Sequence, residues 1–251
     1  VYKRQSLPAK FMEITVSTIL ITGANRGLGL EFTRQYLADG WRVLAASRQP
    51  GDELSSLAAQ HDSLSLHALD VSDHAQIDGL AAELRNQPLD VLLNNAGFFG
   101  TPGFADGGVE AQSFGNSDFD DWARVYRVNV MGPMKMAEAF VEQVAASEQR
   151  KIVTLTSMLG SMGLNNIGGL YAYRSSKAAV NAVMHSMGID LRKRGILAAA
   201  VHPGWARTGM GGPQAELDSE TAVRGVRQVI ANLNEDSLGH VTAYSGEALP
   251  Y

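Results

Sequence analysis

Cysteine is absent from the 251-residue chain, so neither a disulfide framework nor a thiolate metal site can form. The six histidines show no pair at the spacing of metal ligands, and we expect no metal site. A chain without cysteine suits a reducing compartment, and the cytoplasm is the default location that we predict.

Long apolar runs and long basic runs are also missing. No apolar stretch approaches the roughly 20 residues that a membrane helix needs, so we expect no membrane partner. The formal net charge is -5, and no run of Lys and Arg could follow a phosphate backbone, which argues against a nucleic-acid partner. Residues Val1–Lys10 lack the apolar core of a signal peptide. We interpret residues 1–17 as an N-terminal extension, native or introduced in cloning, with Met12 as a candidate natural start.

What the chain does contain is a series of short apolar runs separated by stretches with apolar residues at three- and four-residue spacing. We predict strands at Thr18–Thr22, Arg42–Ala46, Leu64–Leu69, Asp90–Asn94, Lys151–Thr156, Ile196–Val201 and His240–Tyr244. We predict helices at Leu28–Ala38, Ala75–Arg85, Phe119–Ala146 and Ala172–Arg194. This alternation is typical of βαβ units that form a parallel sheet.

The predicted fold is therefore a single α/β domain over residues 18–251, a Rossmann-type, doubly wound parallel sheet of about seven strands with helices on both faces. In such sheets, ligands bind beyond the carboxyl ends of the strands, where the strand order reverses. The stretch Phe98–Ser117 is rich in Gly and Phe and reads as a long loop that could shape a pocket mouth.

A glycine-rich turn follows the first predicted strand, with the sequence Thr22-Gly23-Ala24-Asn25-Arg26-Gly27-Leu28-Gly29. Glycine permits a tight turn and close approach of the backbone, and the helix that follows offers free N–H groups to a pyrophosphate. The pattern differs from G-x-G-x-x-G and cannot be a Walker A loop. Taken alone, it fits a cofactor turn and a merely tight strand-to-helix turn equally well.

Tyr173 and Lys177 stand four residues apart at the head of a predicted helix, which places both on one face. A free tyrosine titrates near pH 10, and a nearby cation would favour its phenolate, so we expect Lys177 to lower the pKa of Tyr173. Taken alone, the pair is more simply explained as two solvated surface residues.

The combination of features is more specific than any one of them. Besides the glycine turn and the Tyr–Lys pair, Asn94-Asn95-Ala96-Gly97 closes the fourth predicted strand and Ser157 follows the fifth. All of these lie at or just past the carboxyl ends of strands. At this point the sequence resembles the short-chain dehydrogenase/reductase family, from about Thr18 to the last residue.

The resemblance implies a catalytic group of Asn129, Ser157, Tyr173 and Lys177, with Tyr173 as the acid/base. It implies cofactor contacts from Gly23, Asn25, Arg26, Gly27, Leu28, Gly29, Ser47, Arg48, Asp70, Val71, Asn95, Ala96, Gly97, Tyr173, Lys177, Pro203, Gly204, Trp205 and Thr208. It further implies that Asn129 supports a water relay to Lys177.

Two rivals for these assignments stay open. Sixteen residues separate Ser157 from Tyr173, where many members of the family keep about thirteen, so Ser161 is an alternative to Ser157. Ser157 is preferred because it ends the strand and a glycine follows three residues later. Tyr171 is an alternative acid, but its i+4 position is Ser175, so it has no lysine partner.

Several details resemble a narrower branch of the family, the C-factor and sniffer-like carbonyl reductases. They are the run Gly169–Arg174, the motif His202-Pro203-Gly204-Trp205 with Thr208 through Gly212 after it, and the ending Gly246–Tyr251. Gly209 departs from this branch, where an acidic residue is usual. His202 is interpreted as a satisfied strand-end residue, and Met158 and Met162 as candidates for an apolar pocket with Phe98 or Trp205.

Cofactor choice depends on the residues after the second predicted strand. NAD-binding folds place an acid there for the ribose 2′-hydroxyl, whereas this chain has Ser47-Arg48 and a second cation, Arg26, in the glycine turn. Guanidinium groups bind phosphate through paired, charge-assisted hydrogen bonds, so we predict NADP(H). The alternative is that both arginines are solvated surface residues.

The predicted function is hydride transfer between the nicotinamide and a small-molecule carbonyl or alcohol substrate. One alternative is a nucleotide-sensing or C-factor-like signalling protein with little turnover. Another is sugar-nucleotide epimerisation or dehydration, which would normally need a larger domain after the sheet than the segments beyond Val201 provide. The resemblance also implies a homodimer or homotetramer formed through the helices Phe119–Ala146 and Ala172–Arg194.

Overall fold

The computed structural model describes residues 16–251, so most of the expected N-terminal extension, Met12 included, lies outside the described residues. One sheet of eight strands organises the chain, in the order β3-β2-β1-β4-β5-β6-β7-β8. The strands are β1 (Thr18–Thr22), β2 (Arg42–Ser47), β3 (Leu64–Ala68), β4 (Val91–Asn94), β5 (Lys151–Leu155), β6 (Leu197–His202), β7 (Val241–Ala243) and β8 (Ala248–Leu249).

The predicted α/β class and its parallel sheet are confirmed. Each of the seven predicted strands is present, and neighbouring strands from β3 to β7 pair in parallel. The eighth strand was not predicted. β8 has two residues and pairs antiparallel with β7 at the sheet edge, which is too short for a period in the sequence to reveal.

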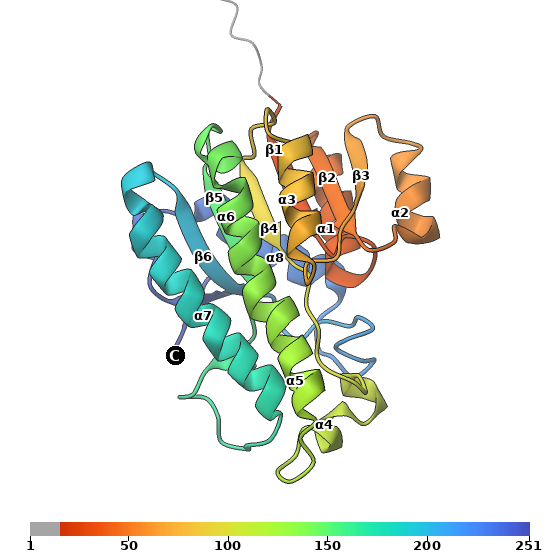
Figure 1. Ribbon diagram of the computed structural model, residues 1–251, viewed down its shortest axis with the longest axis vertical. Helices are drawn as coiled ribbons and strands as arrows, with labels where there is room; N and C mark the ends of the chain where they lie inside the picture. The colour runs from red at the N-terminus through yellow and green to blue at the C-terminus, as the bar shows by residue number, and fades with distance from the viewer. Residues whose placement is uncertain (1–15) are drawn as a thin grey trace, which may run out of the picture.

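Helices cover both faces of the sheet (Figure 1). They are α1 (Gly27–Ala38), α2 (Gly51–Ala58), α3 (His74–Glu83), α4 (Gly108–Ala111), α5 (Phe119–Tyr126), α6 (Gly132–Ala145), α7 (Tyr171–Leu191) and α8 (Ser219–Asn232). In Figure 1, α3, α6 and α7 lie in front of the sheet, and α1 and α8 lie behind it. The sequence had pointed to neither α2 nor α8.

Alternation along the buried strands builds a separate apolar core on each face. Leu20 of β1 faces the layer of α3, α6 and α7, where Phe140 and Met184 are buried. Ile19 and Ile21, its neighbours in the strand, face the opposite layer of α1 and α8. Successive side chains of a strand point to opposite faces, so a continuous apolar run serves two cores at once.

The predicted single helix over Phe119–Ala146 is wrong in its middle. Between α5 and α6 the backbone forms a π-helix over Arg127–Met131. Pro133 has no N–H to donate to the carbonyl of Asn129 four residues earlier, and the helix widens at this point. The predicted loop Phe98–Ser117 also contains short helical turns, at Phe104–Asp106 and in α4.

Strand order reverses between β1 and β4. β1 pairs with β2 on one side and with β4 on the other, and the chain passes through β2 and β3 before it returns to β4. A crevice at the carboxyl ends of the strands follows from this reversal. The helix N-termini of α1 and α7, together with α4, α5 and the connecting segments, lie at this end of the sheet (Figure 1).

Candidate functional site

The glycine turn after β1 brings the start of α1 against the strand end. A Cβ atom added at Gly29 would lie 2.1 Å from the carbonyl oxygen of Gly23, so only glycine fits there. The residue before α1, Arg26, makes no side-chain hydrogen bond to the first turn of the helix. The N-terminal N–H groups and the positive end of the helix dipole are therefore available to an anion.

Asn95, directly after β4, fixes this turn. Its side-chain Nδ2 donates to the carbonyl oxygens of Thr22 at 2.8 Å and Gly23 at 3.1 Å. In return, Thr22 Oγ1 accepts the backbone N–H groups of Asn95 and Ala96, each at 3.1 Å. Four hydrogen bonds thus join β1 to β4 at the point where the strand order reverses.

The segment after β6 closes over the glycine turn from the other side. Pro203, Gly204 and Trp205 follow the strand, and a bridge between Ala206 and Leu217 closes the segment into a loop. At its tip, Thr208 Cγ2 lies 3.3 Å from the position that a Cβ atom of Gly27 would take. The two regions that the sequence predicted to contact a cofactor are therefore in contact with each other.

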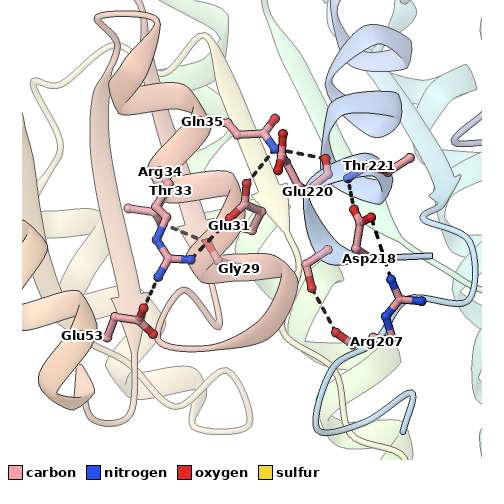
Figure 2. A network of polar contacts seen from close by, with 11 residues as sticks. Gly29, Glu31, Thr33, Arg34, Gln35, Glu53, Arg207, Asp218, Glu220 and Thr221 are labelled. Carbon is pink, nitrogen blue, oxygen red and sulfur yellow. Dashed lines mark hydrogen bonds and ion pairs between the residues drawn. The ribbon is translucent and has the colours of Figure 1, made fainter. Parts of the chain in front are cut away.

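Polar contacts hold α1, α2, α8 and this loop together on the outer face (Figure 2). Arg34 of α1 pairs with Glu31 and with Glu53 of α2, and Gln35 donates to the carbonyl oxygen of Glu220 in α8. Arg207 of the loop lies 3.8 Å from Asp218, which caps α8. Exposed pairs contribute little stability each, so their main effect is to orient these elements.

Ser157, Tyr173 and Lys177 come together beyond the end of β5. The ammonium of Lys177 donates to the carbonyl oxygen of Leu155 at 2.9 Å and lies 5.7 Å from the centre of the Tyr173 ring. The hydroxyl of Ser157 lies close enough to the phenol of Tyr173 to lower its pKa. Tyr173 and Lys177 are buried, one helical turn apart on α7.

Burial dominates the protonation of this pair. It raises the pKa of Tyr173 to about 12, against a smaller lowering by the hydrogen bond from Ser157. Burial also lowers the pKa of Lys177 to about 8. Lys177 is not among the groups that shift the pKa of Tyr173 here, so its expected lowering of that pKa stays a prediction.

Asn129 lies in the π-helix and its side chain is buried. Its Oδ1 accepts the N–H of Phe98 at 2.8 Å, and its Nδ2 donates to the Phe98 carbonyl at 2.8 Å and to Ser176 Oγ at 3.0 Å. The amide therefore joins the segment after β4 to α7. With these bonds made, both N–H groups of the Asn129 amide are used, and only acceptor atoms of this residue remain for the predicted relay toward Lys177.

The two rival residues lie in different surroundings. Ser161 is buried, and its Oγ accepts the N–H of Leu164 at 3.2 Å, a bond within its own loop. The half-exposed ring of Tyr171 meets Phe114 edge to face at a centroid distance of 6.4 Å. Ser157 Oγ likewise accepts the N–H of Leu159 at 3.1 Å, but its hydroxyl also lies close enough to Tyr173 to lower the pKa of the phenol.

Arg26 and Arg48 are exposed, and neither side chain forms a hydrogen bond or ion pair with residues 16–251. Ser47 is buried at the end of β2, with its hydroxyl donating to the Gln49 carbonyl. Burial would raise the pKa of Asp70, but hydrogen bonds from Ser72 and the charge of Arg48 lower it overall. Arg48 thus lies close enough to act on the end of β3.

The remaining predicted cofactor residues line the same edge. Val71 is buried against Gly132, and Gly97 lies beside both Asn129 and Lys177. Asn25 and Leu28 are half-buried in the glycine turn.

His202, at the end of β6, differs from its predicted role as a satisfied residue. Its Nδ1 is buried and has no hydrogen-bond partner among the described residues. Burial and the charge of Lys177 lower the pKa of His202 to about 4, so the ring is neutral at physiological pH.

Sequence reasoning also missed Gln112, whose contacts with Tyr173 are described below. The only signal in the sequence that could have drawn attention to Gln112 is its place in the segment before α5.

The candidate apolar residues lie around this edge but do not all share one surface. Met158 and Met162 are exposed. Trp205 meets Phe104 edge to face at 6.4 Å, which links the loop after β6 to the segment after β4. Phe98 instead lies beneath the guanidinium of Arg124, whose central carbon is 4.6 Å from the centre of the Phe98 ring.

Within residues 16–251, none of the helices is long and apolar enough to cross a membrane.

Comparison with known proteins identifies the family of this chain. A family model described as short chain dehydrogenase matches residues 17–218. The C-signal protein of Myxococcus xanthus is 38% identical over 164 residues, which cover 65% of this chain and 93% of that protein. The carbonyl reductase Sniffer of D. melanogaster superposes with a TM-score of 0.85 at 30% identity, covering 94% of this chain and 100% of that chain. An NADPH-bound carbonyl reductase from chicken fatty liver gives a TM-score of 0.84 at 31% identity, covering 94% of this chain and 99% of that chain.

Proposed function

The chain belongs to the short-chain dehydrogenase family, and we propose on that premise that it reduces a small carbonyl substrate with NADPH. Tyr173 is the proton donor in this proposal, and residues 18–251 act as one catalytic domain.

The buried phenol of Tyr173 is the observation that carries the proposal. Its pKa of about 12 keeps it protonated at neutral pH, which is the form that must donate a proton when a carbonyl oxygen becomes a hydroxyl. Ser157, close enough to lower the pKa of this phenol, offers a second hydroxyl that could bind the same substrate oxygen. The ammonium of Lys177, held by the Leu155 carbonyl, adds positive charge near the developing negative charge.

Three features of the structure fit a dinucleotide. Glycine at position 29 lets the start of α1 pack closely against the end of β1, and the first turn of α1 has no side-chain cap to compete with a pyrophosphate. Arg26 and Arg48 have no partners among residues 16–251 and would hold the 2′-phosphate of NADP(H). Pro203, Thr208 and Lys177 would hold the nicotinamide end. When bound, the nicotinamide supplies the hydride.

A second candidate is a signalling or nucleotide-sensing protein with little turnover. Similarity to the C-signal protein, with 38% identity over 164 residues, favours it. The two functions differ in a measurable way, because a sensor binds cofactor without consuming it.

The test is a panel assay of NADPH oxidation with aldehydes, quinones and ketones. We expect turnover on at least one class of carbonyl, and we expect Ser157→Ala to lower it more than Ser161→Ala. The reverse order would move the site four residues along the loop. Tight cofactor binding without turnover on the whole panel would favour the sensor.

We also propose a homo-oligomer formed through the helices on the front face of the sheet. Phe119 of α5 is 75% exposed and Ile189 of α7 is 64% exposed, and Phe119 stacks on Trp122 with ring planes 4° apart. Exposed large apolar side chains on these helices would be covered by such an interface. Light scattering that gives a monomer at micromolar concentration would contradict this proposal.

A further inference from the structure

Gln112, just after α4, hydrogen-bonds through its side chain to the backbone of both Phe99 and Tyr173. Its side chain is buried, with Nε2 donating to the carbonyl oxygen of Phe99 at 2.7 Å and Oε1 accepting the backbone N–H of Tyr173 at 2.9 Å. Its own carbonyl oxygen accepts the N–H of Tyr171 at 3.4 Å. One partner of the amide is an acceptor and the other a donor, so the two bonds fix its orientation.

Helix α7 depends on these bonds because it has no cap of its own. The residue before it, Leu170, is in the left-handed conformation with φ of 54°, and its apolar side chain makes no capping hydrogen bond. The first N–H groups of a helix have no partner within the helix. Gln112, which lies 61 residues before Tyr173 in the sequence, supplies acceptors for the backbone N–H groups of Tyr171 and Tyr173.

The ring of Tyr173 depends on the same segment. It packs on Phe99 at a centroid distance of 4.9 Å, in a small apolar cluster with Leu170 that is separate from the two main cores. Gln112 holds the carbonyl of that same Phe99. The packing is tight, because a Cβ atom at Gly100 would lie 2.8 Å from Nε2 of Gln112.

We propose that Gln112 is a positioning residue for the acid of the reaction. By capping α7 at Tyr173 and binding Phe99, it fixes the phenol relative to Ser157 and couples that placement to the segment 98–117. This inference rests on the proposed function, since it assigns Gln112 a role only through Tyr173.

The test compares three variants of the full chain. Gln112→Leu removes both side-chain bonds, whereas Gln112→Glu keeps an acceptor for the Tyr173 N–H. Asn116→Ala is the matched control, because the Asn116 side chain bonds only to Glu110 and Ser113 in its own segment. The measurements are kcat and KM for NADPH and for the best substrate of the panel, together with hydrogen exchange at the amide of Tyr173.

We expect Gln112→Leu to lower kcat about tenfold to a hundredfold, the usual effect of a small displacement of a reacting group, with KM for NADPH within about twofold. Gln112→Glu should restore the kcat only in part, because its carboxylate accepts the Tyr173 N–H but cannot donate to the Phe99 carbonyl while ionised. Asn116→Ala should leave the kcat unchanged. Exchange at Tyr173 should speed up in the leucine variant only. If that variant does not fold, Gln112→Asn, which is too short to span both partners, replaces it.

The outcomes separate the two proposals. Faster exchange at Tyr173 with an unchanged kcat would overturn the positioning role and leave the proposed reductase intact. A parallel loss of kcat and NADPH affinity in both Gln112 variants would reduce Gln112 to a structural residue. No turnover by the unaltered protein would overturn the reductase and the positioning role with it, while the exchange data would still show the cap.

Discussion

A buried lysine side chain lies at each end of strand β5, one from the strand itself and one from α7. The two lysines differ in their partners. Lys151, at the start of the strand, donates to the carbonyl oxygens of Ile230 at 2.7 Å and Ala231 at 3.2 Å, in the last turn of α8. Lys177, beyond the end of the strand, donates to the carbonyl of Leu155 alone. Burial lowers the pKa of both, but only Lys151 has a carboxylate, Asp90, whose charge opposes the effect.

Some other polar groups at the two edges of the sheet show the same difference. At the amino edge, Asp90 also accepts the N–H of Thr18 at 2.8 Å, and Gln143 donates to the carbonyl of Ala81 at 3.1 Å. At the carboxyl edge, Asn94 Oδ1 and His202 Nδ1 are buried without partners among the described residues. The amino edge stabilises the fold, whereas the carboxyl edge keeps polar groups at a cost in stability.

The largest effect should come from the carboxyl edge. Tyr173→Phe removes the proton donor and should lower turnover by roughly 10²–10⁴-fold while NADPH affinity stays nearly unchanged. Tyr171→Phe is the matched control and should do far less. Steady-state kinetics and cofactor titration of both variants provide the check, and equal losses would show that the acid is wrongly assigned.

Exchanging the two lysines for methionine tests the comparison directly. Lys177→Met should cut turnover by about 10²-fold or more, because the positive charge near the substrate oxygen is lost. It should also raise the free energy of unfolding by about 1–3 kcal/mol, because it removes a charge whose burial destabilises the fold. Lys151→Met should leave turnover unchanged and lower the free energy of unfolding by about 1–3 kcal/mol, since the end of α8 loses its donor. Denaturant unfolding and kinetics measure both, and the same sign of stability change in the two variants would contradict the distinction.

A smaller effect is expected at the end of β2. Arg48→Ala should weaken NADPH binding about tenfold to a hundredfold and barely change NADH binding, because one charge-assisted bond contributes roughly 1.5–3 kcal/mol. Ser47→Asp should repel the 2′-phosphate and favour NADH. Dissociation constants for both nucleotides provide the measurement. Equal weakening of both would refute the NADP assignment and leave the oxidoreductase standing.

The smallest effect concerns pH. The pKa of Lys177 is about 8 in the folded chain and 10.5 in its ordinary state, so between these values the unfolded chain holds more protons at this position. The contribution of Lys177 to stability therefore rises with pH across this window. The stability advantage of Lys177→Met should be full near pH 7 and fall by at least about half at pH 10. An advantage that stays constant between the two would mean that the ammonium is not buried.

Much of the fold could be predicted from the sequence, since local patterns determine it, and the same patterns led to the candidate site residues. Apolar runs located the seven parallel strands, and strand ends located Ser157 and Asn95. The spacing of Tyr173 and Lys177 predicted that they lie together, because residues four apart are on the same face of a helix. The roles of the predicted site residues stay predictions until they are measured.

What could not be predicted depends on contacts between distant segments. The capping of α7 by Gln112 joins residues 61 apart, and no local pattern marks it. The raised pKa of Tyr173 depends on burial, which the tertiary fold creates. The π-helix at Arg127–Met131 had a local signal in Pro133, but the amphipathic pattern on either side concealed it.

The reversal of strand order also has a consequence for how the chain folds. β1 can pair with β2 as soon as residues 42–47 have left the ribosome, but its other edge stays open until β4 follows at residues 91–94. During that interval an apolar strand edge, with Ile19, Leu20 and Ile21, is exposed to other nascent chains. The hydrogen bond from Thr18 to Asp90 can form only when the edge closes. The crevice that holds the site is therefore created by the same late step that protects the chain from aggregation.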